Sequence, residues 1–325
     1  MKAVLFLLSI IIVAGCISGG SGPATGTSVR VLKFEPLLSR LSEGDRTFVY
    51  LQVQNQGEFD AENVYADLYL HGGFEEETDK WVRDIGRLRA PNKKLGTAGQ
   101  TEEVKWDLTA PEIGSGVKAK SYDFKVDVRY DYQASSWRQF PVIDYARVQK
   151  LTAEGKQLPG GEGGYVQGPI KIGVSVYEPV VFEEGEENYA EIKVVLEKVS
   201  GGYIQTESEF PAGSDCSSDL NCVDTVVLKF PEWMEADHNG DGAPDDCDFD
   251  EVQSEGMVEV GFTGWQKRFV NLIDGQSAQL DCKLKIINSE MGDAEETFPL
   301  IRAEAYYTHH LSSATNVEVI KVVGR

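Results

Sequence analysis

The sequence predicts an all-β protein made of two β-sandwich domains in tandem. Short stretches in which apolar and polar residues alternate dominate the chain, and no stretch carries a sustained helical period. The order of these stretches in the first half recurs in the second. Roughly 300 residues follow an apolar leader, which is more than one small core accommodates and fits two domains.

Alternation defines the strands of the first domain, residues 29–150. The clearest case is residues 122–132, where aromatic and aliphatic residues occupy every second position. Polar turns separate the strands, and Pro36 and Pro111 each follow one. Seven or so short strands with such turns are typical of a β-sandwich. The expected strands are residues 28–34, 48–53, 64–70, 104–108, 122–132 and 141–148.

The second domain, residues 169–325, follows the same plan. Residues 170–176 match the opening strand and are likewise followed by a proline, Pro179. Residues 151–168 contain a Pro-Gly-Gly-Glu-Gly-Gly run and are interpreted as a linker. Residues 207–256 have no counterpart in the first domain and are interpreted as an insertion. The other expected strands are residues 190–196, 278–280, 301–307 and 317–323.

The N-terminus has the pattern of a secretory signal, assigned to residues 1–15. Lys2 precedes a run of apolar residues that only Ser9 interrupts before Gly15. A transmembrane helix needs roughly 20 apolar residues, and this run is shorter. Glycines and Pro23 follow, so residues 16–28 are interpreted as a flexible tether.

Residues 13–16, Val-Ala-Gly-Cys, resemble the lipobox of prokaryotic lipoproteins. The resemblance implies that Cys16 carries a lipid on its thiol and that the chain is cut before it. We therefore expect an exported protein that its lipid anchors to the outer face of the cytoplasmic membrane, at the cell surface. Two acyl chains hold a protein firmly, whereas one gives only marginal anchoring. The first domain would then lie near the membrane and the second would be distal. The alternative is a plain signal peptide with an incidental cysteine.

The cysteine count supports export. Five cysteines would leave a free thiol, and assigning Cys16 to a lipid leaves an even set. Disulfides persist in the oxidising medium outside the cytoplasm. Of the three possible pairings we favour Cys216–Cys222 with Cys247–Cys282, because the first closes a short polar loop. A zinc site of four thiolates is the alternative, although the spacings lack paired C-x-x-C knuckles.

Residues 237–248, DHNGDGAPDDCD, have the spacing of a calcium loop. Oxygen-bearing side chains fall at every second residue, and Gly242 then permits a sharp turn. Calcium takes about six to eight oxygen ligands in flexible geometry, which one such loop can supply. The pattern departs from an EF-hand, because Asp248 replaces the usual glutamate and no amphipathic helix flanks the loop. The alternative is an acidic, solvated hairpin tip.

The same residues resemble a thrombospondin type 3 calcium repeat, D-x-N-x-D-G-x-x-D-x-x-D. The resemblance implies one structural calcium ion that staples the loop rather than acting as a sensor. The implied ligands are the carbonyl of Ala243 and the side chains of Asp237, Asn239, Asp241, Asp245 and Asp248.

Residues 53–57, 61–64 and 68–70 resemble CARDB-type immunoglobulin-like domains of bacterial and archaeal surface proteins. In such a domain the Asn-Gln-Gly at 55–57 would form a turn with positive φ, and the next strand would begin at Asn63. The resemblance covers the first domain. It implies two tandem immunoglobulin-like sandwiches, the second with an insertion stapled by disulfides and calcium. It also implies adhesion, spacing or assembly at a cell surface rather than a reaction.

Composition and motifs disfavour several classes of function. A net charge of −22 argues against nucleic acid as a partner. The sequence contains no nucleophile-elbow, zinc-protease or phosphate-loop motif, so we expect no enzyme. His309 and His310 would point to opposite faces of a strand and are interpreted as an ordinary loop pair rather than a metal site. Trp233 is a candidate partner contact, although covering the sandwich core is the preferred interpretation.

We therefore expect a non-catalytic surface lipoprotein whose sandwiches serve adhesion, structural display or protein binding. One alternative is a subunit of a surface filament or envelope assembly, formed by pairing of exposed edge strands. Another is a lipoprotein that captures a glycan or solute in an aromatic-lined cleft.

Overall fold

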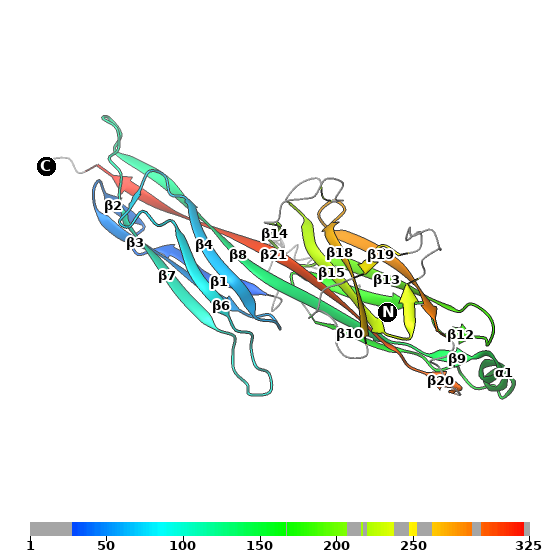
Figure 1. Ribbon diagram of the computed structural model, residues 1–325. Helices are drawn as coiled ribbons and strands as arrows, with labels where there is room; N and C mark the ends of the chain where they lie inside the picture. Colours follow the sequence, from blue (N-terminus) through cyan, green and yellow to red (C-terminus); the bar gives the residue numbers. More distant parts are fainter. Residues whose placement is uncertain are drawn as a thin grey trace, which may run out of the picture.

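The computed structural model describes residues 28–166, 168–206, 216, 220–236, 247–251, 262–287 and 294–321. Within these ranges the protein is all-β apart from one short helix, which confirms the predicted class. Two lobes lie one after the other along a long axis, and the same pair of strands runs through both (Figure 1). No helix in the described ranges is both long and apolar enough to cross a bilayer.

Strands β8 (Ala119–Gln139) and β21 (Leu300–Ile320) form the spine of the molecule. They pair antiparallel in one unbroken register, from Ala119 opposite Ile320 to Gln139 opposite Leu300. At about 3.3 Å per residue, a strand of this length extends about 70 Å. Each strand therefore begins in one lobe and ends in the other.

The first lobe is a sandwich of an outer sheet and one half of a central sheet. The outer sheet has the order β1-β3-β7-β5, and the central sheet adds β4 and β6 beside β8, while β2 pairs with the end of β21. Phe74 packs between the layers, with its ring 5.0 Å from that of Phe124 on β8. The strands are β1 (Val29–Pro36), β2 (Arg40–Ser42), β3 (Arg46–Asn55), β4 (Ala61–Leu70), β5 (Glu75–Glu76), β6 (Val82–Leu88) and β7 (Thr101–Thr109).

The second lobe has the same two layers. Its outer sheet has the order β11-β13-β19-β16, and its half of the central sheet runs β17-β18-β15 beside β21. The layers meet where Val174 N on β11 donates a hydrogen bond to Ser136 Oγ on β8 (3.3 Å). The strands are β11 (Ile170–Val176), β13 (Tyr189–Lys198), β15 (Cys222–Pro231), β16 (Met234–Ala236), β17 (Asp250–Glu251), β18 (Phe262–Asn271) and β19 (Ser277–Ile286).

The two lobes are topological repeats. The outer sheets β1-β3-β7-β5 and β11-β13-β19-β16 correspond strand by strand, and β8-β4-β6 corresponds to β21-β15-β18. The sequence predicts this repeat but treats residues 207–256 as an insertion, whereas β15 and β16 of that segment take the places of β4 and β5. The last strand of each repeat continues past its own lobe and pairs into the other one.

One face of β8 supplies core residues to both lobes. Every second residue from Tyr122 to Ser136 is buried, so the same face points inward along nearly the whole strand. Buried apolar residues of both lobes belong to one continuous cluster. Because burying a large apolar side chain is worth roughly 2 kcal/mol, this row ties the stability of each lobe to the same strand.

The segment between the repeats differs from the expected strand and linker. β9 (Val142–Asp144) stops where α1 (Tyr145–Ala153) begins, because the Asp144 side chain accepts hydrogen bonds from Ala146 N (2.7 Å) and Arg147 N (3.3 Å) and so caps the helix. β10 (Glu162–Val166), within the expected linker, pairs with the end of β8. β12 (Val180–Phe182) and β20 (Glu296–Thr297) flank β9.

The Asn-Gln-Gly at 55–57 shapes its loop through a side chain rather than through positive φ. Asn55 is buried, and its Nδ2 donates to two backbone carbonyls at 2.8 Å each while its Oδ1 accepts from Gly57 N (3.0 Å). Positive φ falls instead at Asn63 (48°), inside β4, which begins at Ala61.

The described chain starts at the middle of the molecule. Ser28 O accepts a hydrogen bond from Gln56 N (2.9 Å). The Ser28 side chain forms a hydrogen bond with the side chain of Tyr130, which lies near the midpoint of β8. In Figure 1 the blue start of β1 lies where the two lobes join. From this junction β1 runs outward into the first lobe, so the described chain enters the molecule between the two lobes. The expected order, with the second domain distal to the tether, stays a prediction, because the tether lies outside the described residues.

The shared strands predict that both lobes unfold together. Replacing Phe124, which is buried in the first lobe, with alanine should cost about 3–5 kcal/mol. Hydrogen exchange should then accelerate in β13 and β19 of the second lobe as well as in β3 and β7. Lys125→Ala, on the exposed face of the same strand, is the control. Faster exchange confined to the first lobe would show that the lobes are independent.

Candidate functional site

Half of the predicted site residues lie outside the described ranges. These are Cys16 and the calcium-loop residues Asp237, Asn239, Asp241, Ala243 and Asp245. Asp248, at the end of that loop, is described and is bound to β19. Its N–H donates to Asp281 O (2.9 Å), and its Oδ2 accepts from Asp281 N (2.7 Å). Its Oδ1 has no hydrogen bond among the described residues, where no group of three or more His, Cys, Asp or Glu could hold a metal ion.

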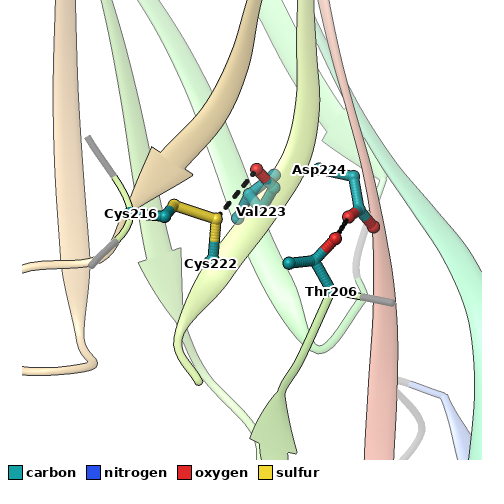
Figure 2. Close-up of a disulfide and its surroundings, with 5 residues drawn as sticks. All are labelled: Thr206, Cys216, Cys222, Val223 and Asp224. Carbon is teal, nitrogen blue, oxygen red and sulfur yellow. Dashed lines mark hydrogen bonds between the residues drawn. A yellow bond between two sulfur atoms is a disulfide. The ribbon is translucent and has the colours of Figure 1, made fainter. Parts of the chain in front are cut away.

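The structure contains both favoured disulfides. Cys216 is bonded to Cys222 at the start of β15, with 6.0 Å between the Cα atoms, and Thr206 hydrogen-bonds Asp224 beside it (Figure 2). Cys247 is bonded to Cys282 of β19. The Cys247–Cys282 disulfide therefore links the segment 207–256 to β19 beside Asp248, whereas Cys216–Cys222 closes a short loop within the segment at the start of β15.

A groove lies over the outer sheet of the second lobe, at the Cys247–Cys282 disulfide. It encloses about 660 Å³, and Tyr177 at its rim is 82% exposed. Lys283 lies 4.1 Å above the ring of Tyr189 on the same sheet. Carboxylates and lysines line the groove beside a comparable area of apolar surface, so it offers hydrogen-bond donors and acceptors as well as apolar contacts. The lining includes Ser175, Glu191, Lys193, Asp248, Asp281 and Lys283.

Trp233 packs against the second-lobe core. Its side chain is half-buried, and its carbonyl accepts a hydrogen bond from Ile287 N (2.9 Å). This position fits the preferred interpretation, in which the tryptophan covers the sandwich core.

The two histidines at 309 and 310 lie inside β21 rather than in a loop. They are buried on opposite faces of the strand, as the alternation of strand side chains requires. Both sit at the waist, which we define as the junction of the lobes around Tyr130 and His309. The sequence contained the signal, because Ile301, Ala303, Ala305 and Tyr307 lead in alternation to His309.

His309 is the centre of a buried polar cluster on the core face of the waist. We call His309, Tyr130, Tyr132 and Tyr307 the waist cluster. His309 Nε2 lies 3.0 Å from Gly201 O, so Nε2 carries the proton and donates it to that carbonyl. His309 Nδ1 then accepts a hydrogen bond from the Tyr130 hydroxyl (2.9 Å). Burial lowers the pKa of His309 to about 3 and keeps the ring neutral.

The tyrosines of the waist cluster connect loops from both lobes. Tyr132 OH accepts from Phe59 N and Tyr307 OH accepts from Ile170 N, each at 3.2 Å. Burial raises the pKa of Tyr132 to about 12 and that of Tyr307 well above 10, so both stay protonated. The cluster therefore satisfies backbone groups at the start of β11 and in the loop before β4.

The opposite face of the waist carries a histidine–carboxylate pair. His310 Nδ1 lies 2.6 Å from Asp127 Oδ2, and the His310 ring stacks on Tyr203 of β14 (Tyr203–Ile204) at 4.6 Å. His310 Nε2 is buried and has no hydrogen bond among the described residues. The contact between Asp127 and His310 joins β8 to β21, and the stacking of Tyr203 on His310 packs β14 against these two strands.

Comparison of the sequence with known proteins found no match, neither to a protein-family model nor to a curated protein. Function therefore has to be inferred from the residues themselves.

The neutral His309 predicts a loss of stability in mild acid. In the unfolded chain this histidine is protonated below its ordinary pKa of 6.5, whereas in the folded protein it stays neutral down to about pH 3. The unfolded state then binds more protons, so the free energy of unfolding should fall as the pH drops through 6.5, by about 2 kcal/mol at pH 5. Urea titrations at pH 7, 6 and 5 measure this slope.

His309→Gln should reduce that pH dependence, and His71→Gln, which removes a histidine from the first lobe, is the control. The change in unfolding free energy with pH can be measured for the His309→Gln variant even though its unfolding free energy at pH 7 is lower than that of the unaltered protein. Equal slopes for the unaltered protein and both variants would contradict the assignment.

Proposed function

We propose that the protein is a non-catalytic lipoprotein of a prokaryotic cell surface. Its two immunoglobulin-like lobes form one rigid display rod, which a lipid on Cys16 holds at the outer face of the cytoplasmic membrane. The observation that carries the proposal is the lipobox-like Val-Ala-Gly-Cys, followed by twelve residues, 17–28, that lead to the buried start of β1 at Val29. Twelve residues span at most about 40 Å when extended, so the rod stays close to the bilayer.

The fold supports display rather than catalysis. Long paired strands, two disulfides and a polar waist all restrict movement, which suits a protein that holds surfaces at fixed distances. The perturbed ionisable groups of the waist cluster act on one another and on backbone groups within the core.

Removal of the lipid site should release the protein. Intact mass spectrometry of protein extracted from membranes should show a chain beginning at Cys16 with diacylglyceryl mass added. Cys16→Ser should move the protein from the membrane to the soluble fraction or leave an uncleaved leader, whereas Ser18→Ala should change neither. A mature chain without added mass, released equally by detergent-free washing, would refute the anchor.

We further propose that residues 237–248 bind one structural calcium ion. Both ends of this loop are fixed to β19, because Ala236 pairs with Leu284 and Cys247 is bonded to Cys282. Residues 282 and 284 are about 7 Å apart along the strand, so the loop has to return to nearly its starting point. Closely held ends reduce the conformational entropy that a metal-bound loop must lose.

Calcium should stabilise the whole rod. At 1 mM calcium and an affinity of about 10⁻⁴ M, the gain in unfolding free energy is about 1–2 kcal/mol. A chelator should lower the melting temperature of the single transition by a few degrees. Asp241→Asn with Asp245→Asn should abolish the response, and Glu183→Gln with Glu184→Gln is the control with equal charge change. An unchanged melting temperature in chelator would rule out the metal.

A further inference from the structure

A basic hairpin loop, residues 89–100, projects from the first lobe between β6 and β7 (Figure 1). Residues 85–101 contain no aspartate or glutamate, although the chain as a whole has a net charge of −22. The same stretch contains two arginines and two lysines, Arg87, Arg89, Lys93 and Lys94. Positive charge is therefore concentrated in one place on an acidic protein.

Hydrogen bonds hold the loop in an ordered shape. Asn92 and Thr97 exchange two backbone hydrogen bonds of 3.1 Å, and Asn92 Oδ1 also accepts from the N–H groups of residues 94 and 95. At the base, Gln100 N donates to Arg89 O (2.9 Å). The tip therefore presents Lys93, with its side chain 78% exposed, and Leu95, 75% exposed, in a fixed arrangement.

The loop lies beside the start of the described chain. Residues 56–60 and 90–94 line one cavity of about 700 Å³, and Gln56 of this set donates its N–H to Ser28 O. The described chain therefore begins on the side of the rod that carries the basic loop. Cys16 is only twelve residues upstream of Ser28.

We propose that the basic hairpin loop binds anionic lipid headgroups of the leaflet that holds the anchor, an inference that rests on the lipid anchor proposed for Cys16. Lys and Arg near an anionic surface each strengthen membrane binding roughly fivefold, and Leu95 can enter the interface beside them. Glu58 pairs with Lys93, and both Asp60 and Glu62 pair with Arg87, so these two cations contribute less to lipid binding. Arg89 and Lys94 form no ion pair within 4 Å in the described part of the chain, and Asp60 attracts Arg89 at longer range.

The net negative charge of the rod does not oppose this contact strongly. At physiological ionic strength charges are screened over about 8 Å, so only groups near the bilayer act on it. A loop that projects from the lobe brings its cations within this distance while most carboxylates stay outside it.

The test uses a chain of residues 17–325, which contains every described residue and neither Cys16 nor the leader. Its cosedimentation is measured with vesicles of pure phosphatidylcholine and with vesicles containing about 30% phosphatidylglycerol, at about 0.1 M and 0.5 M salt. We expect binding to the anionic vesicles only, weakened by salt. Lys93→Gln with Lys94→Gln should weaken it about tenfold, and Leu95→Ser severalfold. Lys120→Gln with Lys125→Gln, on the exposed face of β8, is the control with equal charge change.

Equal binding to both vesicle types, or equal losses in the loop variant and the control, would overturn the proposal. Binding to a soluble polyanion without any vesicle binding would also overturn it and indicate an anionic polymer instead. A failure of this proposal can be told apart from a failure of the proposed lipid anchor. The anchor is tested by the added mass on Cys16 of the native protein, whereas vesicle binding is measured on a chain that lacks Cys16.

Discussion

The rest of the structure depends on one antiparallel ladder, the pairing of β8 with β21. Because side chains alternate along a strand, a slip of one residue would turn the buried row from Tyr122 to Ser136 out to solvent. A slip of two residues would keep apolar groups inside but would separate Tyr130 from His309. The apolar row thus fixes which face is buried, and the waist cluster fixes where along the ladder the strands meet.

The waist shows how two sandwich cores can be joined without a linker. An all-apolar junction would accept many alignments, whereas hydrogen-bonding groups accept few. A buried donor or acceptor that loses its partner costs about 1–3 kcal/mol. Hydrogen bonds connect His309 and Tyr132 each to a different loop and Tyr307 to the start of β11. Misalignment would therefore leave several such groups unpaired at once. Figure 1 shows the result, two lobes that share strands rather than a flexible connection.

Alternation and repetition made much of this fold predictable. The class, the repeat of strands 28–34 and 170–176, and both disulfides follow from residue patterns. The length of the ladder did not, because Ser135 and Ser136 on β8, and Ser312 and Ser313 on β21, interrupt the apolar pattern that marks a strand. Their pairing comes from a partner about 180 residues away, which a local window does not contain. The strand β15 was missed for a similar reason, since its polar neighbours suggested an insertion.

The candidate sites were less accessible to sequence reasoning. His309 was interpreted from the sequence as part of a loop pair although alternation leads to it, and only the fold brings its partners Tyr130 and Gly201 to it. Cys16 and most of the calcium loop remain predictions of the sequence alone. Asp248 is compatible with both interpretations of residues 237–248, the calcium loop and the acidic hairpin tip. One of its carboxylate oxygens accepts a hydrogen bond from the backbone of β19, and the other accepts none from the described residues.

The start of the described chain at the waist has a mechanical consequence if the anchor proposed at Cys16 holds the protein. A rod that is fastened at one end transmits a pull along its whole length to the fastening. A rod that is fastened near its centre behaves as a balanced lever, because each tip lies about 35 Å from the pivot. Force on one tip would rotate this molecule before it strained the anchor. The two ends would then sweep equal arcs over the membrane, one carrying α1 and the other the end of β21.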